Sequence, residues 1–174
     1  MLRWILTVLL SLAAAAALAA GKRADGAGDP GGKPVVEVFM PNPCLACIDW
    51  GAYLMDQGFT VVYKETADME AVKRRLKVPK DLESVHTAMV AGYFVEGHVP
   101  AEDIWDLLKE KPKARGLTVP GLPRGAPGRE FSNPTCEAAC TMLDSTTGEK
   151  NPEHEIYETL LVLPDGKTKR WARH

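Results

Sequence analysis

The chain has 174 residues, of which 45% are hydrophobic and 25% are charged, and its formal net charge is −2. A chain of this length and composition can bury a sizeable core as one domain. The slightly acidic balance argues against nucleic acid as a partner, because phosphate binding requires a basic face.

The first 19 residues have the pattern of a secretory signal peptide. Arg3 gives a positive start, an apolar run follows, and Ala17 to Ala19 offer small residues for cleavage. A retained membrane anchor is the alternative. Residues 20–33 form a Gly-rich stretch typical of a flexible linker, and no later run is long and apolar enough to span a bilayer. We therefore expect an exported, periplasmic protein whose domain begins at residue 34.

The first predicted unit is a strand followed by a helix. The β-branched apolar run at residues 34–40 predicts a buried strand, and prolines stop it. Pro43 directly precedes Cys44, where a helix would start. From Cys47 onward, apolar residues recur at helical spacing until Gly58 closes the element.

Further strands and helices alternate along the chain. Residues 59–65 predict a second strand, and Asp68 can cap a helix over 69–77. Residues 87–99 predict two short strands around a glycine, and a proline then opens a helix over 101–111. This β-α-β-α-β-β-α order resembles thioredoxin. It predicts an α/β, thioredoxin-like core over residues 34–111.

Residues 112–174 are predicted to form a C-terminal extension. Residues 112–130 hold four prolines and four glycines and predict an ordered loop or coil. Residues 135–143 predict one or two helical turns. Residues 157–172 predict a β-hairpin around a Pro-Asp-Gly turn.

The four cysteines form two close pairs, Cys44 with Cys47 and Cys136 with Cys140. A bridge within such a pair closes only a tiny loop and restricts the unfolded chain little, so the pairs indicate chemistry more than stapling. At a helix start, N–H groups and the helix dipole stabilise a thiolate. A depressed pKa is therefore expected for Cys44. The thiolate serves disulfide exchange and soft metals alike, so the spacing leaves both functions open.

The second pair has the spacing that places both sulfurs on one helix face. Cys136 and Cys140 could chelate one ion or contribute to a larger site, and a simple bridge is the alternative. Four thiolates suit tetrahedral zinc or cuprous ions. We expect the two pairs to converge in one site.

Two histidines lie near the predicted strands. His86 stands roughly where thioredoxin-like oxidoreductases carry a cis-proline facing the cysteine pair, so its imidazole could face the thiols and bind copper or zinc. The alternative is a hydrogen bond to a loop carbonyl. For His98, at a strand-to-helix turn, satisfying the turn backbone is favoured over a ligand role.

Three motifs in order carry a family resemblance: "CLACIDWGAYLMDQGF", "VPKDLESVHTAMVAGYFVEGHVP" and "GLTVPGLPRGAPGRE". In these the chain resembles the CopG-like periplasmic metal-binding proteins, which are linked to copper resistance. The resemblance implies a thioredoxin-like fold whose C-terminal extension helps bind a cysteine-bridged copper cluster. It also implies an oxidoreductase role that interconverts Cu(I) and Cu(II).

The chain departs from the family pattern at four soft-ligand positions. Ala46 replaces a cysteine of the first motif, and Val85 replaces the cysteine before the histidine. Leu122 and Arg129 replace two methionines. The departures indicate a divergent member with a smaller or altered copper site, or with thiol redox chemistry instead.

The leading hypothesis is a periplasmic copper-binding protein of copper resistance or homeostasis. Copper would be held by thiolates and by one imidazole nitrogen, and zinc is a variant. The expected partners are copper ions and a periplasmic metal-export or redox protein, and we expect a monomer. The ligands are Cys44, Cys47, Cys136, Cys140 and His86.

Two other hypotheses remain open. In a thiol-disulfide oxidoreductase, Cys44 would be the exposed attacking thiolate and Cys47 the resolving residue, with Cys136 and Cys140 as a second redox pair. In a non-catalytic envelope domain, both pairs would be structural disulfides.

Overall fold

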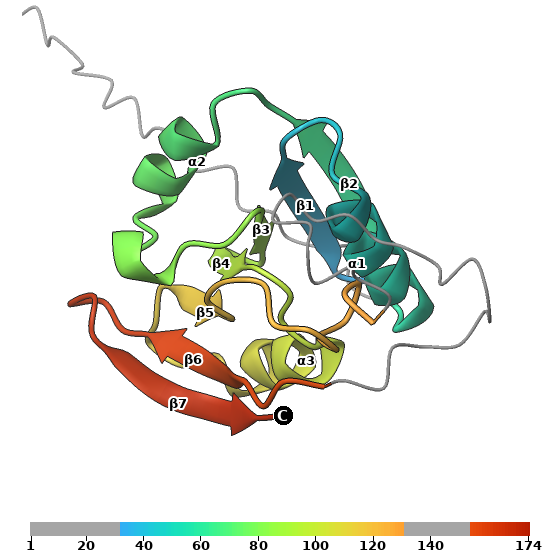
Figure 1. Cartoon of the computed structure of the whole chain (residues 1–174). Coiled ribbons are helices and arrows are strands. Elements are labelled where there is room, and N and C mark those ends of the chain that lie inside the picture. Colours follow the sequence, from blue (N-terminus) through green and yellow to red (C-terminus); the bar gives the residue numbers. More distant parts are fainter. Residues whose placement is uncertain (1–31, 131–153) are drawn as a thin grey trace, which may run out of the picture.

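The computed structural model of the chain describes residues 32–130 and 154–174. Within these ranges one seven-stranded mixed sheet has the order β2-β1-β3-β4-β5-β6-β7, accompanied by three α-helices and a 3-10 turn (Figure 1). The predicted α/β class is confirmed. The elements are β1 (Val35–Met40), α1 (Leu45–Asp56), β2 (Thr60–Glu65), α2 (Met69–Leu76), η1 (Lys80–Leu82), β3 (Thr87–Val90), β4 (Tyr93–Glu96), α3 (Ala101–Glu110), β5 (Gly116–Thr118), β6 (Glu158–Val162) and β7 (Thr168–Arg173).

The strand β1 sets the position of the cysteine pair. Val36, Val38 and Met40 are buried at every second position, as the pleat of a strand requires. β1 pairs in parallel with β2 and antiparallel with β3. A parallel pair needs a crossover connection, and α1 supplies it. The cysteine pair therefore lies at the end of an interior strand, where the chain turns into α1.

The helix α1 forms where the sequence predicts it, but its buried side is not the periodic apolar set. Ile48 and Met55 are 42% and 43% exposed. The buried side carries Trp50, Leu54 and smaller residues of the first turns. Both sides of this helix are apolar, so periodicity predicts a helix without indicating which side faces the sheet. Trp50 determines which side of α1 faces the sheet, because its large ring gains most from burial.

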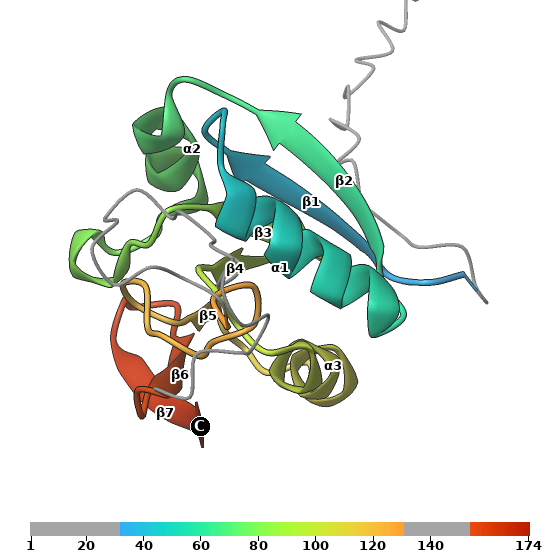
Figure 2. The ribbon, with the colours of Figure 1, turned by 45° about the vertical axis from the view of Figure 1, so that its right-hand side comes forward.

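The sheet has a core on each face. On one face α1 contacts α3, where the Tyr53 hydroxyl donates to Glu102 Oε2 at 3.3 Å (Figure 2). Next to this contact, Trp50 Nε1 donates to the Val99 carbonyl at 2.9 Å, and the rings of Phe59 and Trp105 lie 4.4 Å apart. On the other face a smaller cluster forms around Phe94 and Leu82. Asp68 caps α2 as predicted, accepting from the Ala71 backbone N–H through Oδ1 at 2.9 Å.

The sequence predicts that the whole Pro/Gly segment is a loop or coil, but part of it forms a strand. Residues Gly116–Thr118 form β5, which pairs in parallel with β4 and antiparallel with β6. Strand partners on both sides override the low β-propensity of this stretch. A Cβ on Gly116 would lie 2.0 Å from the Phe94 carbonyl oxygen, so a side chain there would prevent the pairing. β6 and β7 extend the same sheet to its edge.

The described helices include none that is long and apolar enough to cross a membrane. The predicted signal peptide at 1–19, nearly all of the linker at 20–33, and the segment with Cys136 and Cys140 lie outside the described residues.

Candidate metal centre

The first cysteine pair opens α1. Cys44 is the N-cap, its Sγ accepts from the Cys47 backbone N–H at 3.3 Å, and a disulfide bond joins the two residues. Cys44 is 2% exposed and Cys47 is fully buried. The expectation of an exposed attacking Cys44 is therefore wrong for this state of the protein. The physical reason is that the N-cap side chain folds back over the first helical turn, toward the core.

His86 is fully buried directly before β3. Its ring centroid lies 4.5 Å from that of Trp50 and 4.8 Å from that of His98. Among the described residues, neither ring nitrogen has a hydrogen-bond partner. The Gly97 backbone lies close enough to affect the pKa of this imidazole, but the ring forms no hydrogen bond of ordinary geometry to a loop carbonyl of the described residues. A buried polar atom without a partner costs about 1–3 kcal/mol, so these nitrogens require an explanation.

One ring nitrogen of His98 bonds a loop carbonyl, which is the structural role that the sequence favours, and the other ring nitrogen has no partner among the described residues. Its Nδ1 lies 2.8 Å from the Pro127 carbonyl oxygen. A carbonyl only accepts, so Nδ1 must carry the hydrogen. Nε2 then presents a lone pair, and it is buried with no hydrogen-bond partner in the described residues. Metal-binding histidines commonly have this arrangement, with one ring nitrogen donating to a carbonyl and the other free to ligate.

The β3-β4 hairpin brings the two histidines together. His86 precedes β3 and His98 follows β4, and Thr87 pairs directly with Glu96. Both imidazoles therefore stand at the same end of the hairpin. The sequence held this signal, because two strands of similar length around one turn place their outer flanks side by side. His98 was nevertheless not among the predicted ligands.

Burial keeps both imidazoles neutral. It holds the pKa of His86 well below its ordinary value; the neighbouring His98 and the Lys73 ammonium add to this effect, and the Gly97 backbone opposes it. Burial also lowers the pKa of His98 to about 4, with the Arg129 guanidinium contributing and the Pro127 carbonyl opposing. A neutral imidazole is the form that binds metal.

The 120–130 loop lies against the first turns of α1. A Cβ on Gly128 would lie 2.6 Å from the Trp50 backbone nitrogen, and Gly128 has φ +76°. Arg129, at a family methionine position, is buried, and its Nη2 donates to the Leu122 carbonyl at 3.1 Å. The Arg129 guanidinium thus joins the two ends of the 120–130 loop. Ala46, which replaces a family cysteine, is buried in α1.

Of the predicted ligands, Cys44, Cys47 and His86 lie within the described residues. Trp50 links the elements, since it follows Cys47 by three residues and contacts the ring of His86. The convergence with Cys136 and Cys140 falls outside the described residues and stays a prediction. Within 32–130 and 154–174, no group of three or more His, Cys, Asp or Glu side chains is arranged to hold a metal ion.

Gly97, between β4 and His98, should tolerate no side chain. It has φ +75°, and a Cβ would lie 2.4 Å from the Val119 carbonyl oxygen. Gly92 is the matched control, because it has φ +86° with nothing within 4 Å of a Cβ. Both Gly→Ala changes carry the left-handed backbone cost. We expect Gly97→Ala to lower the free energy of unfolding by about 1–3 kcal/mol more than Gly92→Ala, from overpacking. Urea denaturation measures the difference, and equal losses would contradict the close approach.

The chain is similar to a known protein family and to solved structures. The family described as "Protein of unknown function, DUF411" matches residues 82–129, which include both buried histidines. No curated protein matches the chain. A solved structure titled "Copper resistance protein copG- Form 2" is 33% identical, with a TM-score of 0.68, and the match covers 82% of this chain and 98% of that one. A second, titled "Copper resistance protein copG- Form 1", is 34% identical with a TM-score of 0.67 and the same coverage. The chain belongs to the CopG-like family of copper resistance proteins.

Proposed function

We propose that the protein binds Cu(I) in the periplasm and acts in copper resistance or homeostasis. The donors are thiolate sulfurs and imidazole nitrogens, a soft set that suits cuprous ions. His98 joins the set that the sequence predicts. The proposed ligands are Cys44, Cys47, Cys136, Cys140, His86 and His98.

One observation supports this proposal most strongly. His86 and His98 hold unpartnered ring nitrogens in a fully buried place, with ring centroids 4.8 Å apart. Ordinary buried polar groups find hydrogen-bond partners, so the open nitrogens are suited to binding a metal ion. The fixed Nδ1–H tautomer of His98 presents Nε2 for coordination. The residues present therefore fit a metal ion.

Binding through the first pair requires reduction. Cys44 and Cys47 are joined by a disulfide, and a disulfide sulfur is a poor ligand compared with a thiolate. Two electrons from a thiol reductant would open the bond and yield two thiols, which lose their protons on metal binding. This dependence makes copper binding responsive to the redox state of the compartment.

The finer assignments belong to the same proposal. Residues 34–111 would form a thioredoxin-like core, and the extension would carry Cys136 and Cys140 to the site. Mixed sulfur and nitrogen donors can hold copper in both oxidation states, which would permit the interconversion of Cu(I) and Cu(II).

The test is anaerobic copper binding by the reduced protein. We expect Cu(I) to be retained after desalting and to resist competition by Zn(II), because thiolates favour the softer ion. Metal analysis combined with free-thiol counting gives the number of ions and the number of thiols they protect. A reduced protein that retains no copper, with all thiols free, would refute the proposal.

A thiol-disulfide oxidoreductase is the second candidate. The Cys44–Cys47 disulfide at a helix N-terminus favours it, since the Cys44 Sγ already accepts the Cys47 N–H. The burial of Cys44 disfavours it, because an attacking thiolate must reach its substrate. This function predicts reduction of disulfide substrates by Cys44 and Cys47 alone, with no copper held. Purely structural disulfides predict neither activity.

A further inference from the structure

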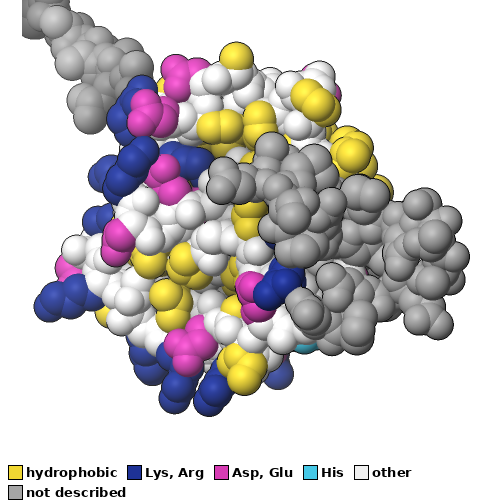
Figure 3. Space-filling view, in the orientation of Figure 1, with side chains coloured by type: hydrophobic (Ala, Val, Ile, Leu, Met, Phe, Trp, Pro, Cys, Tyr) yellow, Lys and Arg dark blue, Asp and Glu magenta, His cyan; other side chains and the backbone are white. Residues whose placement is uncertain are grey.

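One ion pair of α2 is buried on the face of the sheet opposite the histidines. The side chains of Lys73 and Glu96 are 6% and 0% exposed, and they contact each other directly. The other ion pairs of α2, which join Glu70 to Arg74 and to Lys80, have side chains that are 66% to 74% exposed. At the surface over α2, charged side chains of both signs lie side by side (Figure 3). Burying two ions costs several kcal/mol and often stabilises less than apolar residues would, so the pair indicates a purpose other than stability.

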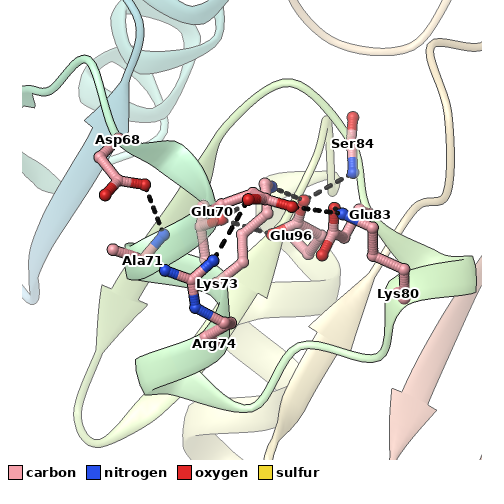
Figure 4. A network of polar contacts seen from close by, with 10 residues as sticks. Asp68, Glu70, Ala71, Lys73, Arg74, Lys80, Glu83, Ser84 and Glu96 are labelled. Atoms are coloured by element: carbon pink, nitrogen blue, oxygen red, sulfur yellow. Dashed lines mark hydrogen bonds and ion pairs between the residues drawn. The ribbon is translucent and has the colours of Figure 1, made fainter.

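The Glu96 carboxylate collects three donors. It accepts from the Ser84 backbone N–H at 2.6 Å through Oε1 and from the Thr87 hydroxyl at 2.6 Å through Oε2. The Lys73 ammonium bonds the same carboxylate (Figure 4). It also donates to Thr87 Oγ1 at 3.0 Å. Ser84 and Thr87 bracket His86. One buried carboxylate therefore holds the chain on both sides of the imidazole.

We call the Glu96 carboxylate and its partner Lys73 the Glu96 clamp. The alternation of side chains along the strands places this clamp on the face of the sheet opposite the His86 ring. Thr87 and Glu96 are direct partners in the β3-β4 pair, and both contact Lys73 of α2. Their neighbours Ala88 and Val95 face the main core. His86 precedes Thr87, so it faces that core side as well, against Trp50. The clamp can fix the His86 backbone without occupying the side on which the ring nitrogens lie.

No proline restricts this segment, and its other hydrogen bonds each hold one point of it. Between Pro79 and Pro100 the sequence has no proline whose ring could fix a backbone angle. The His86 carbonyl accepts from the Gly97 N–H at 3.1 Å, and the Ser84 hydroxyl donates to the Gly121 carbonyl at 2.5 Å. These bonds join the His86 segment to the turn before His98. The Glu96 carboxylate is the one group that bonds both flanks of His86 within the described residues.

We propose that Glu96 is a positioning residue for the metal site: its carboxylate, paired with Lys73, fixes the segment from Ser84 to Thr87 and so aims the His86 imidazole toward His98. The inference rests on the proposed copper function, because the imidazole so fixed would be a ligand. Burial raises the pKa of Glu96, and the Lys73 ammonium is the largest influence opposing that rise. Removing both charges together leaves no unpaired buried ion, which makes the double substitution the appropriate test.

The test compares two double variants of the full chain with a surface control. Lys73→Met/Glu96→Leu removes the clamp and keeps the volume. Lys73→Met/Glu96→Gln retains an amide oxygen that can accept from Ser84. Lys80→Met/Glu70→Leu applies the same change to an exposed pair. Each protein is measured for its thermal midpoint, for hydrogen exchange at the His86 amide without metal, and for Cu(I) affinity after reduction.

We expect the Leu variant to keep or raise the thermal midpoint, since apolar replacement of a buried pair is often neutral or stabilising. Exchange at the His86 amide should nevertheless accelerate, and Cu(I) affinity should fall about 10- to 100-fold, as for loss of an outer-shell partner. The Gln variant should recover part of both, and the surface control should change neither.

A folded Leu variant with unchanged His86 exchange would overturn the positioning role, even if its copper affinity fell. If the Leu variant does not fold, the Gln variant decides in the same way: accelerated exchange supports the role, and native exchange overturns it. The exchange measurement needs no metal. A native protein that binds no Cu(I) would therefore refute the proposed function while leaving the positioning of His86 separately decided.

Discussion

Replacing Cys44 and Cys47 with serine should weaken Cu(I) binding by the reduced protein more than about a hundredfold, beyond the cost of losing an outer-shell partner. Serine keeps the size of the side chain and removes the soft sulfur that cuprous ions prefer. The fold should survive, because the Cys44–Cys47 bridge closes a very short loop and such a bridge restricts the unfolded chain little. Competition with a chromophoric Cu(I) chelator measures the affinity, and circular dichroism checks the fold.

Companion variants separate the ligands. Cys136→Ser/Cys140→Ser should weaken binding comparably if one site is shared, whereas His86→Ala should cost less, as one nitrogen among sulfurs. His98→Ala should resemble His86→Ala, because both rings hold open nitrogens in the same buried place. His154→Ala is the control, since this histidine is exposed. A variant with all four cysteines replaced that bound copper as tightly as the native chain would refute the leading hypothesis.

Much of the fold follows from local sequence signals. Prolines, the Asp68 cap and the apolar runs predict each strand and α-helix from β1 to α3, because those signals act within a few residues. The 3-10 turn at Lys80–Leu82 was not predicted. β5 could not be predicted in this way. Its three residues form a strand only because β4 and β6 lie on either side, and β6 comes from a distant part of the chain. The buried side of α1 likewise depends on where Trp50 finds room.

The site was predicted through its chemistry more than through its surroundings. The pairing of Cys44 with Cys47 and the importance of His86 follow from residue type and position. Burial of Cys44, the tautomer of His98 and the Glu96 clamp depend on contacts between segments far apart in sequence, such as Pro127 with His98. The sequence indicates which residues are candidates for chemistry, and tertiary contacts determine their protonation and exposure.

Acid should destabilise the metal-free protein through its buried histidines. The pKa of His98 is about 4 in the folded protein, whereas an unfolded chain has the ordinary value of about 6.5. Between these values the unfolded state binds more protons, so the free energy of unfolding falls as the pH is lowered. From pH 7 to pH 4, His98 alone should cost about 3 kcal/mol, at about 1.4 kcal/mol per pKa unit. His86, whose pKa is also lowered by burial, should add to the loss.

The His98→Asn variant isolates this effect from the other titrating groups. Burial raises the pKa of Asp103 and Glu96, so protonation of these carboxyls stabilises the folded state as the pH falls, opposite to the histidines. The pH dependence of the free energy of unfolding of the native protein is therefore the sum of both effects. Asparagine has no titration in this range, and its amide N–H can still donate to the Pro127 carbonyl. Urea unfolding of both proteins from pH 7 to pH 4 should therefore show their free energies of unfolding converging or crossing as the pH falls. A constant difference between native and His98→Asn across this range would mean that His98 titrates normally, and the neutral ring with an open Nε2 would lose its physical basis.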